Sequence, residues 1–264
     1  MRAILFSLAV LFGSAAVASA EVKTRKVEYK FDGVTFIGHL AWDDANKDKR
    51  PGVLVVHEWW GLDDYAKIRA EQLAKMGYVA FACDMYGNGK MVEASKEHAK
   101  DAGEMAGMVR KNVDVWRGRA KEALKVLSDF EFTDKERLGA MGYCFGGTTA
   151  LQLAASGADL KAVATFHSAL PKLKPDEAKA IKAKVLVCHG ADDKFIPADS
   201  IAGFKKALGD AKVPLDFQEY KGAVHSFTVM GSEKHMIDGM AFNKDADDKS
   251  WASMKSLFAE AFKK

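Results

Sequence analysis

Hydrophobic residues along this chain fall into short runs of two kinds, and the order of these runs predicts the fold. Residues 27–31 alternate strictly between apolar and polar side chains, and residues 34–42 do so in part, which is typical of strands with one exposed face. Asp32 and Gly33 lie between the two runs and are typical of a tight hairpin turn. The first two strands are therefore expected to be antiparallel neighbours.

Continuous apolar runs follow, as expected for parallel strands that are covered on both faces. These runs are residues 52–56, 78–83, 138–143, 162–166, 185–189 and 215–220. Helical patterns lie between or after them, at residues 63–76, 112–130 and about 246–262. The order predicts an α/β fold: an open, mostly parallel sheet of eight strands with an antiparallel edge and helices on both faces.

The first twenty residues differ in kind from the rest of the chain. Arg2 precedes an apolar stretch over residues 3–17, and Ala18-Ser19-Ala20 follows it. This pattern predicts a cleaved secretory signal peptide over residues 1–20, with an uncleaved membrane anchor as the alternative. We therefore expect residues 21–264 to form one domain in a bacterial periplasm or outside the cell, with no membrane span after cleavage.

Composition excludes some classes of protein. With 48% hydrophobic and 28% charged residues, the chain is expected to be globular. Its 39 basic and 36 acidic side chains are spread along the sequence, so no basic stripe is available for nucleic acid. A monomer or weak dimer is expected. Residues 85–111 are polar and have no strand partner, which predicts an excursion over the site, and the short connection over residues 166–182 excludes a large lid.

One turn carries the main chemical signal. Gly142-Tyr143-Cys144-Phe145-Gly146-Gly147 directly follows an apolar run, as in a nucleophile elbow, where a strand stops, one side chain is thrust out and a helix begins. The flanking glycines allow the strand and helix backbones to approach closely. A thiol lies where hydrolases usually carry a hydroxyl, although a buried structural cysteine is the alternative.

Other polar groups follow the ends of predicted strands, where open α/β sheets bind ligands. His57-Glu58-Trp59-Trp60-Gly61 follows the third strand, the pair Asp192 and Asp193 follows the seventh, and His225 follows the eighth. Nucleophile, acid and histidine then occur in the chain order of the α/β-hydrolases. Several residues remain rival candidates for the acid or the base, namely Asp84, Asp192, His57, His167 and His189.

These segments together resemble the dienelactone hydrolases, a branch of the α/β-hydrolase fold that uses cysteine. The resemblance covers the chain from about Val34 to the C-terminal helix. It implies that Cys144 is the nucleophile, His225 the base and Asp193 the acid that orients it. Asp193 is preferred to Asp192 because it stands four residues before Pro197, as the family acid does.

The resemblance also implies the supporting groups. Glu58 would be the partner of the resting thiol, and the backbone N–H groups of Trp59 and Phe145 would form the oxyanion hole. The implied activity is hydrolysis of a carboxylic ester or lactone through an acyl-cysteine intermediate. Trp60 and Phe227 are candidates for the substrate pocket.

The chain departs from the family pattern at one position. Family members that open dienelactones bind the substrate carboxylate with two arginines, one of them four residues after the histidine, where this chain has Val229. The second could not be assigned among Arg110, Arg117 and Arg119. A neutral or bulkier substrate is therefore expected, since an unpaired carboxylate is costly in an apolar cleft.

No cofactor or metal is expected, because the sequence has neither a dinucleotide-binding glycine motif nor a zinc-type spacing of ligands. The alternative to an ester hydrolase is a periplasmic redox enzyme or sensor that uses the Cys144 thiol. It lacks a clear resolving cysteine, because Cys83 and Cys188 fall in predicted strands that are not neighbours.

Overall fold

The computed structural model describes residues 21–263, which form one eight-stranded sheet in the order β1-β2-β4-β3-β5-β6-β7-β8. The strands are β1 (Val22–Phe31), β2 (Val34–Asp43), β3 (Arg50–Val56), β4 (Val79–Cys83), β5 (Thr133–Tyr143), β6 (Ala162–Phe166), β7 (Lys184–Gly190) and β8 (Leu215–Tyr220). β2 pairs antiparallel with both β1 and β4, and the pairs from β4 to β8 are parallel. The predicted α/β fold and antiparallel edge are confirmed. The predicted signal peptide lies outside the described residues.

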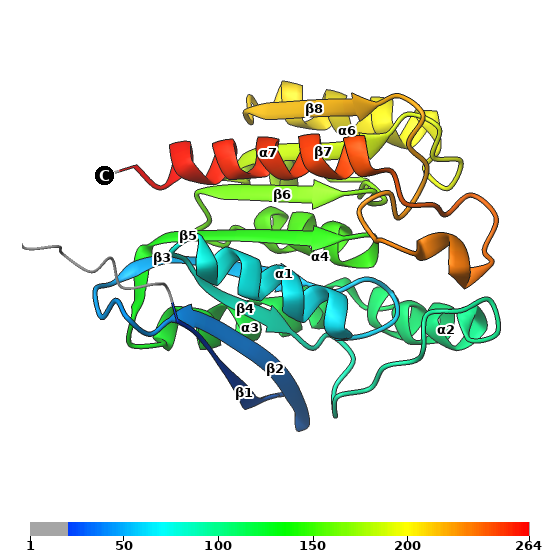
Figure 1. Ribbon diagram of the computed structural model, residues 1–264. Coiled ribbons are helices and arrows are strands. Elements are labelled where there is room, and N and C mark those ends of the chain that lie inside the picture. The colour runs from blue at the N-terminus through cyan, green and yellow to red at the C-terminus, as the bar shows by residue number, and fades with distance from the viewer. Residues whose placement is uncertain (1–20, 264) are drawn as a thin grey trace, which may run out of the picture.

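Helices cover both faces of the sheet, as the pattern predicts. They are α1 (Asp64–Lys75), α2 (Ala99–Arg110), α3 (Val113–Asp129), α4 (Phe145–Ala155), α5 (Pro175–Lys179), α6 (Ala198–Asp210) and α7 (Lys244–Ala261), with a 3₁₀ turn η1 (Ser232–His235). α1 and α7 lie on one face, and α3, α4 and α6 lie on the other (Figure 1). The Asn112 side chain accepts hydrogen bonds from the N–H groups of Asp114 and Val115, which explains why α3 begins at the predicted residue.

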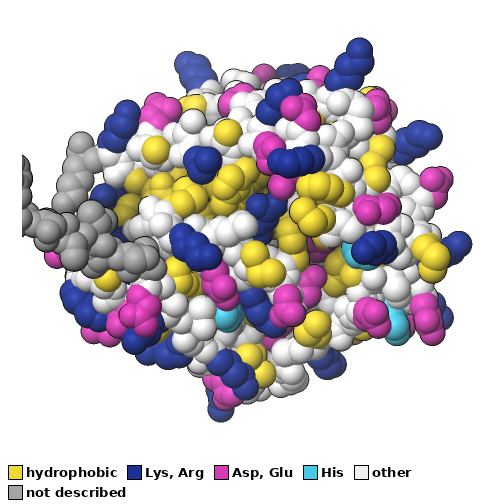
Figure 2. All heavy atoms as spheres, in the orientation of Figure 1, with side chains coloured by type: hydrophobic (Ala, Val, Ile, Leu, Met, Phe, Trp, Pro, Cys, Tyr) yellow, Lys and Arg dark blue, Asp and Glu magenta, His cyan; other side chains and the backbone are white. Residues whose placement is uncertain are grey.

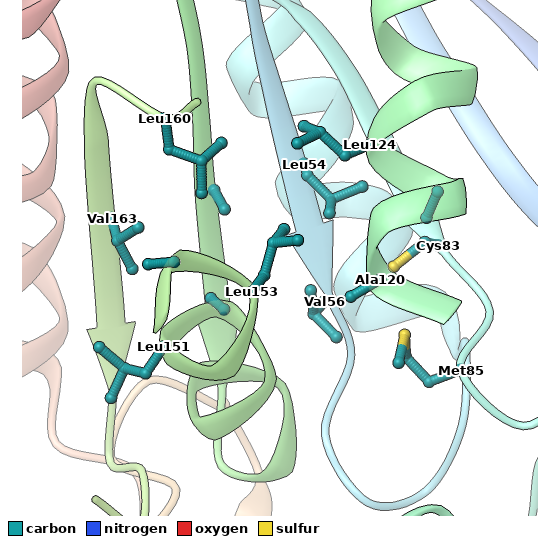
Figure 3. Close-up of a cluster of buried hydrophobic side chains, with 14 of the residues drawn as sticks. Leu54, Val56, Cys83, Met85, Ala120, Leu124, Leu151, Leu153, Leu160 and Val163 are labelled. Atoms are coloured by element: carbon teal, nitrogen blue, oxygen red, sulfur yellow. The ribbon is translucent and has the colours of Figure 1, made fainter. Parts of the chain in front are cut away.

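A hydrophobic core lies between the sheet and the helices α3 and α4. Leu54 and Val56 of β3 face Ala120 and Leu124 of α3, and Leu153 of α4 fills the neighbouring space (Figure 3). Each buried aliphatic side chain of this size stabilises the fold by about 1.5–3 kcal/mol. The carboxyl ends of β3, β5 and β6 are thereby fixed relative to one another, and the polar loops that follow them start from rigid positions.

Residues 85–111 differ from the prediction in two ways. They include α2, which the sequence did not reveal because its buried positions, Ala102, Ala106 and Val109, are mostly small and give a weak apolar pattern. They also have a partner: Met91 forms an isolated antiparallel bridge with Gly61, and the Val92 N–H donates to the Trp60 carbonyl at 2.9 Å. This segment is therefore tied to the loop that follows β3.

The surface carries interspersed charge. Basic and acidic side chains alternate over the face formed by α1 and α7, with apolar side chains gathered in a hollow between them (Figure 2). This distribution fits the small formal net charge of +3. Within residues 21–263, no helix is both long and apolar enough to cross a membrane.

Candidate active site

Cys144 occupies the sharp turn between β5 and α4. Its φ is +51°, a left-handed conformation that costs a residue other than glycine about 1–3 kcal/mol. A side chain on Gly142 would collide with the Gly146 backbone, and one on Gly146 would collide with the Val56 carbonyl. The turn therefore requires both glycines. It holds the half-buried Cys144 side chain at the carboxyl end of the sheet.

His225 and Asp193 meet beside this turn, although 32 residues separate them in the sequence. The distance between His225 Nδ1 and Asp193 Oδ2 is 2.7 Å. The other carboxylate oxygen of Asp193 accepts from the Phe195 N–H at 2.9 Å, so the carboxylate is held from both sides. Asp193 therefore fixes the orientation of the imidazole and favours a proton on Nδ1.

The opposite edge of the His225 ring faces the Cys144 side chain and forms a hydrogen bond with it. Burial lowers the pKa of His225, but the Cys144 sulfur and the Asp193 carboxylate together outweigh burial and raise the pKa to about 10. Sulfur, imidazole and carboxylate thus form one hydrogen-bonded line. In such a line the imidazole can take a proton from the thiol and return it.

Two of the rival candidates have structural roles. The Asp84 carboxylate accepts from the N–H groups of Tyr86, Gly87 and Gly89 at 2.8–3.0 Å and holds the turn after β4. His57 accepts from the Met85 N–H at 3.1 Å through Nε2 and donates to a main-chain carbonyl through Nδ1. Both nitrogens of His57 are therefore engaged in joining two loops.

Asp192 and His189 also lie apart from the line. Asp192 is exposed, and its N–H donates to the Ala223 carbonyl at 3.0 Å. His189 belongs to β7, where burial lowers its pKa below the ordinary value. Asp193, rather than Asp192, is the carboxylate bonded to the His225 ring, so the geometry favours Asp193 and His225.

The expected oxyanion-hole donors lie at the ends of neighbouring strands. β3 pairs with β5, with Val56 opposite Gly142, so Trp59 and Phe145 each follow a matched strand position by three residues. Phe145 is the first residue of α4, where a backbone N–H has no partner within the helix. Two N–H groups at this point are suited to binding negative charge on an oxygen.

Glu58 is buried beside Ser226 and His225. Its side chain is 2% exposed, and its Oε1 accepts from the Ser226 hydroxyl at 3.2 Å. The Cys144 thiol forms a hydrogen bond with His225. Burial raises the pKa of Glu58 to about 7, the Asp63 charge adds to this effect, and His225 opposes it. Glu58 therefore interacts with Ser226 and His225, and its expected role as partner of the resting thiol stays a prediction.

The expected pocket aromatics are buried, which corrects the prediction. Trp60 is 1% exposed and packs against Trp59, and Phe227 is 0% exposed and packs against Tyr220. The aromatic side chain that stays accessible is Phe195, which is 47% exposed with its ring centroid 5.2 Å from that of His225. Phe227 follows the base by two residues, but its ring turns inward, which the sequence alone does not reveal.

The model of the dienelactone hydrolase family matches residues 37–262. The chain belongs to the dienelactone hydrolase family. It is therefore a hydrolase that acts on ester bonds.

Relatives and solved structures of the dienelactone hydrolase type match over most of the chain. "Protein usf" of Aquifex pyrophilus and the "Putative carboxymethylenebutenolidase" of Aquifex aeolicus are each 29% identical over 205 residues, covering 76% of this chain and 85% of theirs. The structure of m3DLH is 37% identical with a TM-score of 0.88, and a dienelactone hydrolase-like promiscuous phosphotriesterase from metagenomic libraries is 36% identical with the same TM-score. Each covers 92% of this chain and 99% of that protein.

One of the three arginine candidates, Arg110, lies near the elbow. The guanidinium of Arg110, at the end of α2, lies 5.3 Å from the centroid of the Phe145 ring. Burial raises the pKa of Tyr86 above its ordinary value, Cys144 adds to this effect, and Arg110 opposes it. Arg110 thus lies beside Phe145 and near Tyr86, whereas Val229 is buried and apolar. Sequence reasoning could not choose Arg110, because α2 itself was not predicted.

The other cysteines of this dienelactone hydrolase are distant from Cys144. Cys83 ends β4 and Cys188 lies in β7, and each of these strands is two positions away from β5. At about 4.8 Å per strand this separation is roughly 10 Å, which exceeds the reach of a disulfide. Both thiols are buried. Within residues 21–263, no group of three or more His, Cys, Asp or Glu side chains is arranged to hold a metal ion.

Proposed function

We propose that this protein is an exported carboxylic ester or lactone hydrolase that works through a Cys144-His225-Asp193 triad. The observation that carries the proposal is the hydrogen-bonded line of the three side chains at a strained elbow. A structural cysteine needs neither the positive φ nor an oriented imidazole. The redox alternative is disfavoured, because Cys83 and Cys188 lie too far from Cys144 to resolve an oxidised thiol.

The reaction would proceed in two halves. In the first, His225 Nε2 takes the thiol proton as the sulfur attacks the carbonyl carbon, and the carbonyl oxygen becomes an oxyanion. The oxyanion collapses, the bond to the alcohol breaks, and the departing alkoxide receives the proton from His225. In the second, His225 takes a proton from water, the hydroxide attacks the thioester, and the acid is released as the sulfur recovers its proton.

The backbone N–H groups of Trp59 and Phe145 would bind the oxyanion in both halves. Removing one such donor commonly costs about 3–4 kcal/mol of transition-state stabilisation. Because these donors belong to the backbone of a fixed turn and a helix end, they need little reorganisation during the reaction. The matched register of β3 and β5 supports this assignment of the two donors.

The surroundings of the triad suggest the charge of the substrate. Arg110 lies on the elbow side and offers one cation. Beside Phe195, a cavity of about 540 Å³ is lined by three acidic side chains, Asp192, Glu233 and Asp238, and by the basic Lys194 as well as apolar side chains. We infer a substrate that is neutral or carries a single anionic group toward Arg110, with its bulk toward Phe195.

Export is supported by the sequence of residues 1–20, which has the pattern of a cleaved signal peptide. A thiol enzyme outside the reducing cytoplasm risks oxidation, which follows thiolate character and exposure. The half-buried position of Cys144 limits that exposure.

The test is turnover of small activated esters by the Cys144→Ala variant. Hydrolysis is expected to fall to the background rate, because alanine offers no nucleophile, while the circular dichroism spectrum stays that of the wild type. Cys83→Ala is the matched control and should keep turnover, since Cys83 is buried in β4. Unchanged turnover in Cys144→Ala would refute the proposal.

A further inference from the structure

A buried histidine that the proposed mechanism does not use lies directly behind the triad. His167 follows β6, is 0% exposed and has a φ of +41°. Its Nδ1 lies 3.7 Å from Glu58 Oε1, and within the described residues it has no hydrogen-bond partner. Its Nε2 lies 2.8 Å from Thr228 Oγ1. The backbone of His167 is thus strained, its ring is fully buried, and its Nδ1, which has no hydrogen-bond partner within the described residues, lies near the Glu58 carboxylate.

A chain of hydrogen bonds on the far side of His167 fixes where its proton lies. Arg69 can only donate, and its Nε donates to the Tyr65 oxygen at 3.2 Å. The Tyr65 hydroxyl has two acceptors within reach, Thr228 Oγ1 at 2.7 Å and the Thr228 carbonyl at 3.2 Å. Because the carbonyl already accepts from Arg69 Nη2 at 3.2 Å, we assign the Tyr65 proton to the closer Oγ1. The hydrogen of the Thr228 hydroxyl is then left for His167 Nε2, so neutral His167 carries its own proton on Nδ1, toward Glu58.

Arg69 is anchored in its turn, which makes the chain rigid. Its guanidinium bonds to Asp247 Oδ1 at 2.6 Å and packs over the Trp251 ring of α7 at 4.7 Å. Arg69 therefore holds the far end of this chain in place as a residue that only donates hydrogen bonds.

We propose that His167 is a positioning residue that sets the ionisation of Glu58 and, through Glu58, the reactivity of the Cys144-His225 pair. An Nδ1–H directed at the carboxylate favours its ionised form. An ionised Glu58 favours a cationic His225 and therefore a thiolate at Cys144. The proposal rests on the proposed function of Cys144 as nucleophile.

The other groups around Glu58 come from two parts of the chain. Asp63 and Tyr65 lie at the start of α1, and His225 belongs to the loop after β8. Burial raises the pKa of Glu58 to about 7, Asp63 acts in the same direction, and His225 opposes them. Burial and the charge of His225 lower the pKa of His167, so His167 faces the carboxyl as a neutral ring.

The test is the pH dependence of Cys144 alkylation by iodoacetamide, followed by intact mass from pH 5 to pH 9. The wild type is expected to show an inflection near pH 7, where Glu58 ionises. Loss of the ring N–H in His167→Phe should move this inflection upward by about one pH unit. His167→Gln keeps an N–H donor and should restore it toward the wild-type position. Glu58→Gln should remove the inflection.

Two further variants keep the test decisive if His167→Phe does not fold. Thr228→Val removes the hydroxyl that fixes the His167 proton and should move the inflection upward as well. Thr165→Val is the matched control: Thr165 lies in β6, the strand that His167 follows, its buried hydroxyl has no hydrogen-bond partner within residues 21–263, and its profile should equal that of the wild type.

An unmoved inflection in both His167→Phe and Thr228→Val would overturn the role of His167, as would an inflection that survives in Glu58→Gln. Ester turnover measured on the same samples separates the two proposals. If the alkylation profile of the variants shifts but the wild-type protein does not hydrolyse esters, the proposed function is wrong and the role of His167 is retained.

Discussion

Two buried carboxylates flank His225, and their surroundings differ sharply. Asp193 accepts one hydrogen bond from His225 at 2.7 Å and another from the Phe195 N–H at 2.9 Å. Glu58 accepts a single bond from Ser226 at 3.2 Å, and His167 Nδ1 stays 3.7 Å away. A carboxylate with both oxygens bonded is stabilised as an anion, whereas a buried one with few donors is destabilised. The first can orient a base permanently, and the second can change its charge near neutral pH.

The comparison explains how similar groups come to serve different purposes. The Asp193 side chain belongs to a turn whose own backbone supplies a donor, so its position is built into the fold. Glu58 depends on side chains from distant elements, namely Ser226 and His167. Its charge is therefore open to adjustment by substitutions that leave the triad untouched.

The largest effect is expected from Asp193→Asn. The asparagine amide would present an N–H to His225 Nδ1 and favour the wrong tautomer, so kcat/KM for an activated ester should fall by roughly 10³-fold or more. Asp192→Asn is the matched control: the neighbouring Asp192 is exposed, so its substitution should leave kcat/KM unchanged. Equal losses in the two variants would remove the distinction drawn for Asp193.

A smaller effect, on stability, is expected from Glu58→Gln. Because the pKa of Glu58 is raised from 4.5 to about 7, the folded state holds its proton more tightly than the unfolded state does. This contribution is complete below pH 4.5 and is lost as the pH rises through 7. Urea unfolding at pH 8 should therefore show the variant to be more stable than the wild type by up to about 3 kcal/mol.

At pH 4 the same variant should be close to the wild type, since Glu58 is then protonated in both states. Glu136→Gln, at an exposed position, is the control for removing one carboxylate. A variant that is no more stable than the wild type at pH 8 would show that Glu58 is better satisfied than its contacts indicate.

The smallest effect is expected from Arg110→Gln. A partly solvated ion pair is worth on the order of 1 kcal/mol, so kcat/KM for a carboxylated lactone should fall roughly 5-fold. The methyl ester of that lactone, which lacks the charge, should be unaffected. Lys111→Gln is the control, because it removes the same charge one residue away. If it lowers kcat/KM as much as Arg110→Gln does, the effect comes from the general electrostatic field of positive charge rather than from contact between Arg110 and the substrate carboxylate.

Much of the fold could be predicted from the sequence, because parallel strands that are covered on both faces read as continuous apolar runs. β6 and β8 begin and end at the predicted residues. β5 begins earlier than predicted, at Thr133, because its polar first residues pair with Arg50 and Pro51 ahead of a β-bulge. Pairing by polar residues at the start of a strand leaves no apolar pattern in the sequence.

The candidate site was predictable as far as local motifs reach. The elbow glycines and the placement of polar groups after strands identified Cys144, Asp193 and His225 as candidates, and the structure brings these three side chains together. The contacts of Glu58 and the inward turn of Phe227 were not predictable, because they depend on which of several nearby side chains fills a buried space. His167 was only a rival candidate, since a lone histidine after a strand carries no motif.

The central claim is that Cys144 forms a covalent acyl intermediate with help from His225. The most direct measurement is intact mass after rapid acid quench of the enzyme with activated esters and lactones. The account predicts an added mass equal to the acyl group, located on the peptide that contains Cys144 and absent from the Cys144→Ala variant. Ester turnover at a wild-type rate with the acyl group on another residue, or turnover that persists in Cys144→Ala, would contradict it.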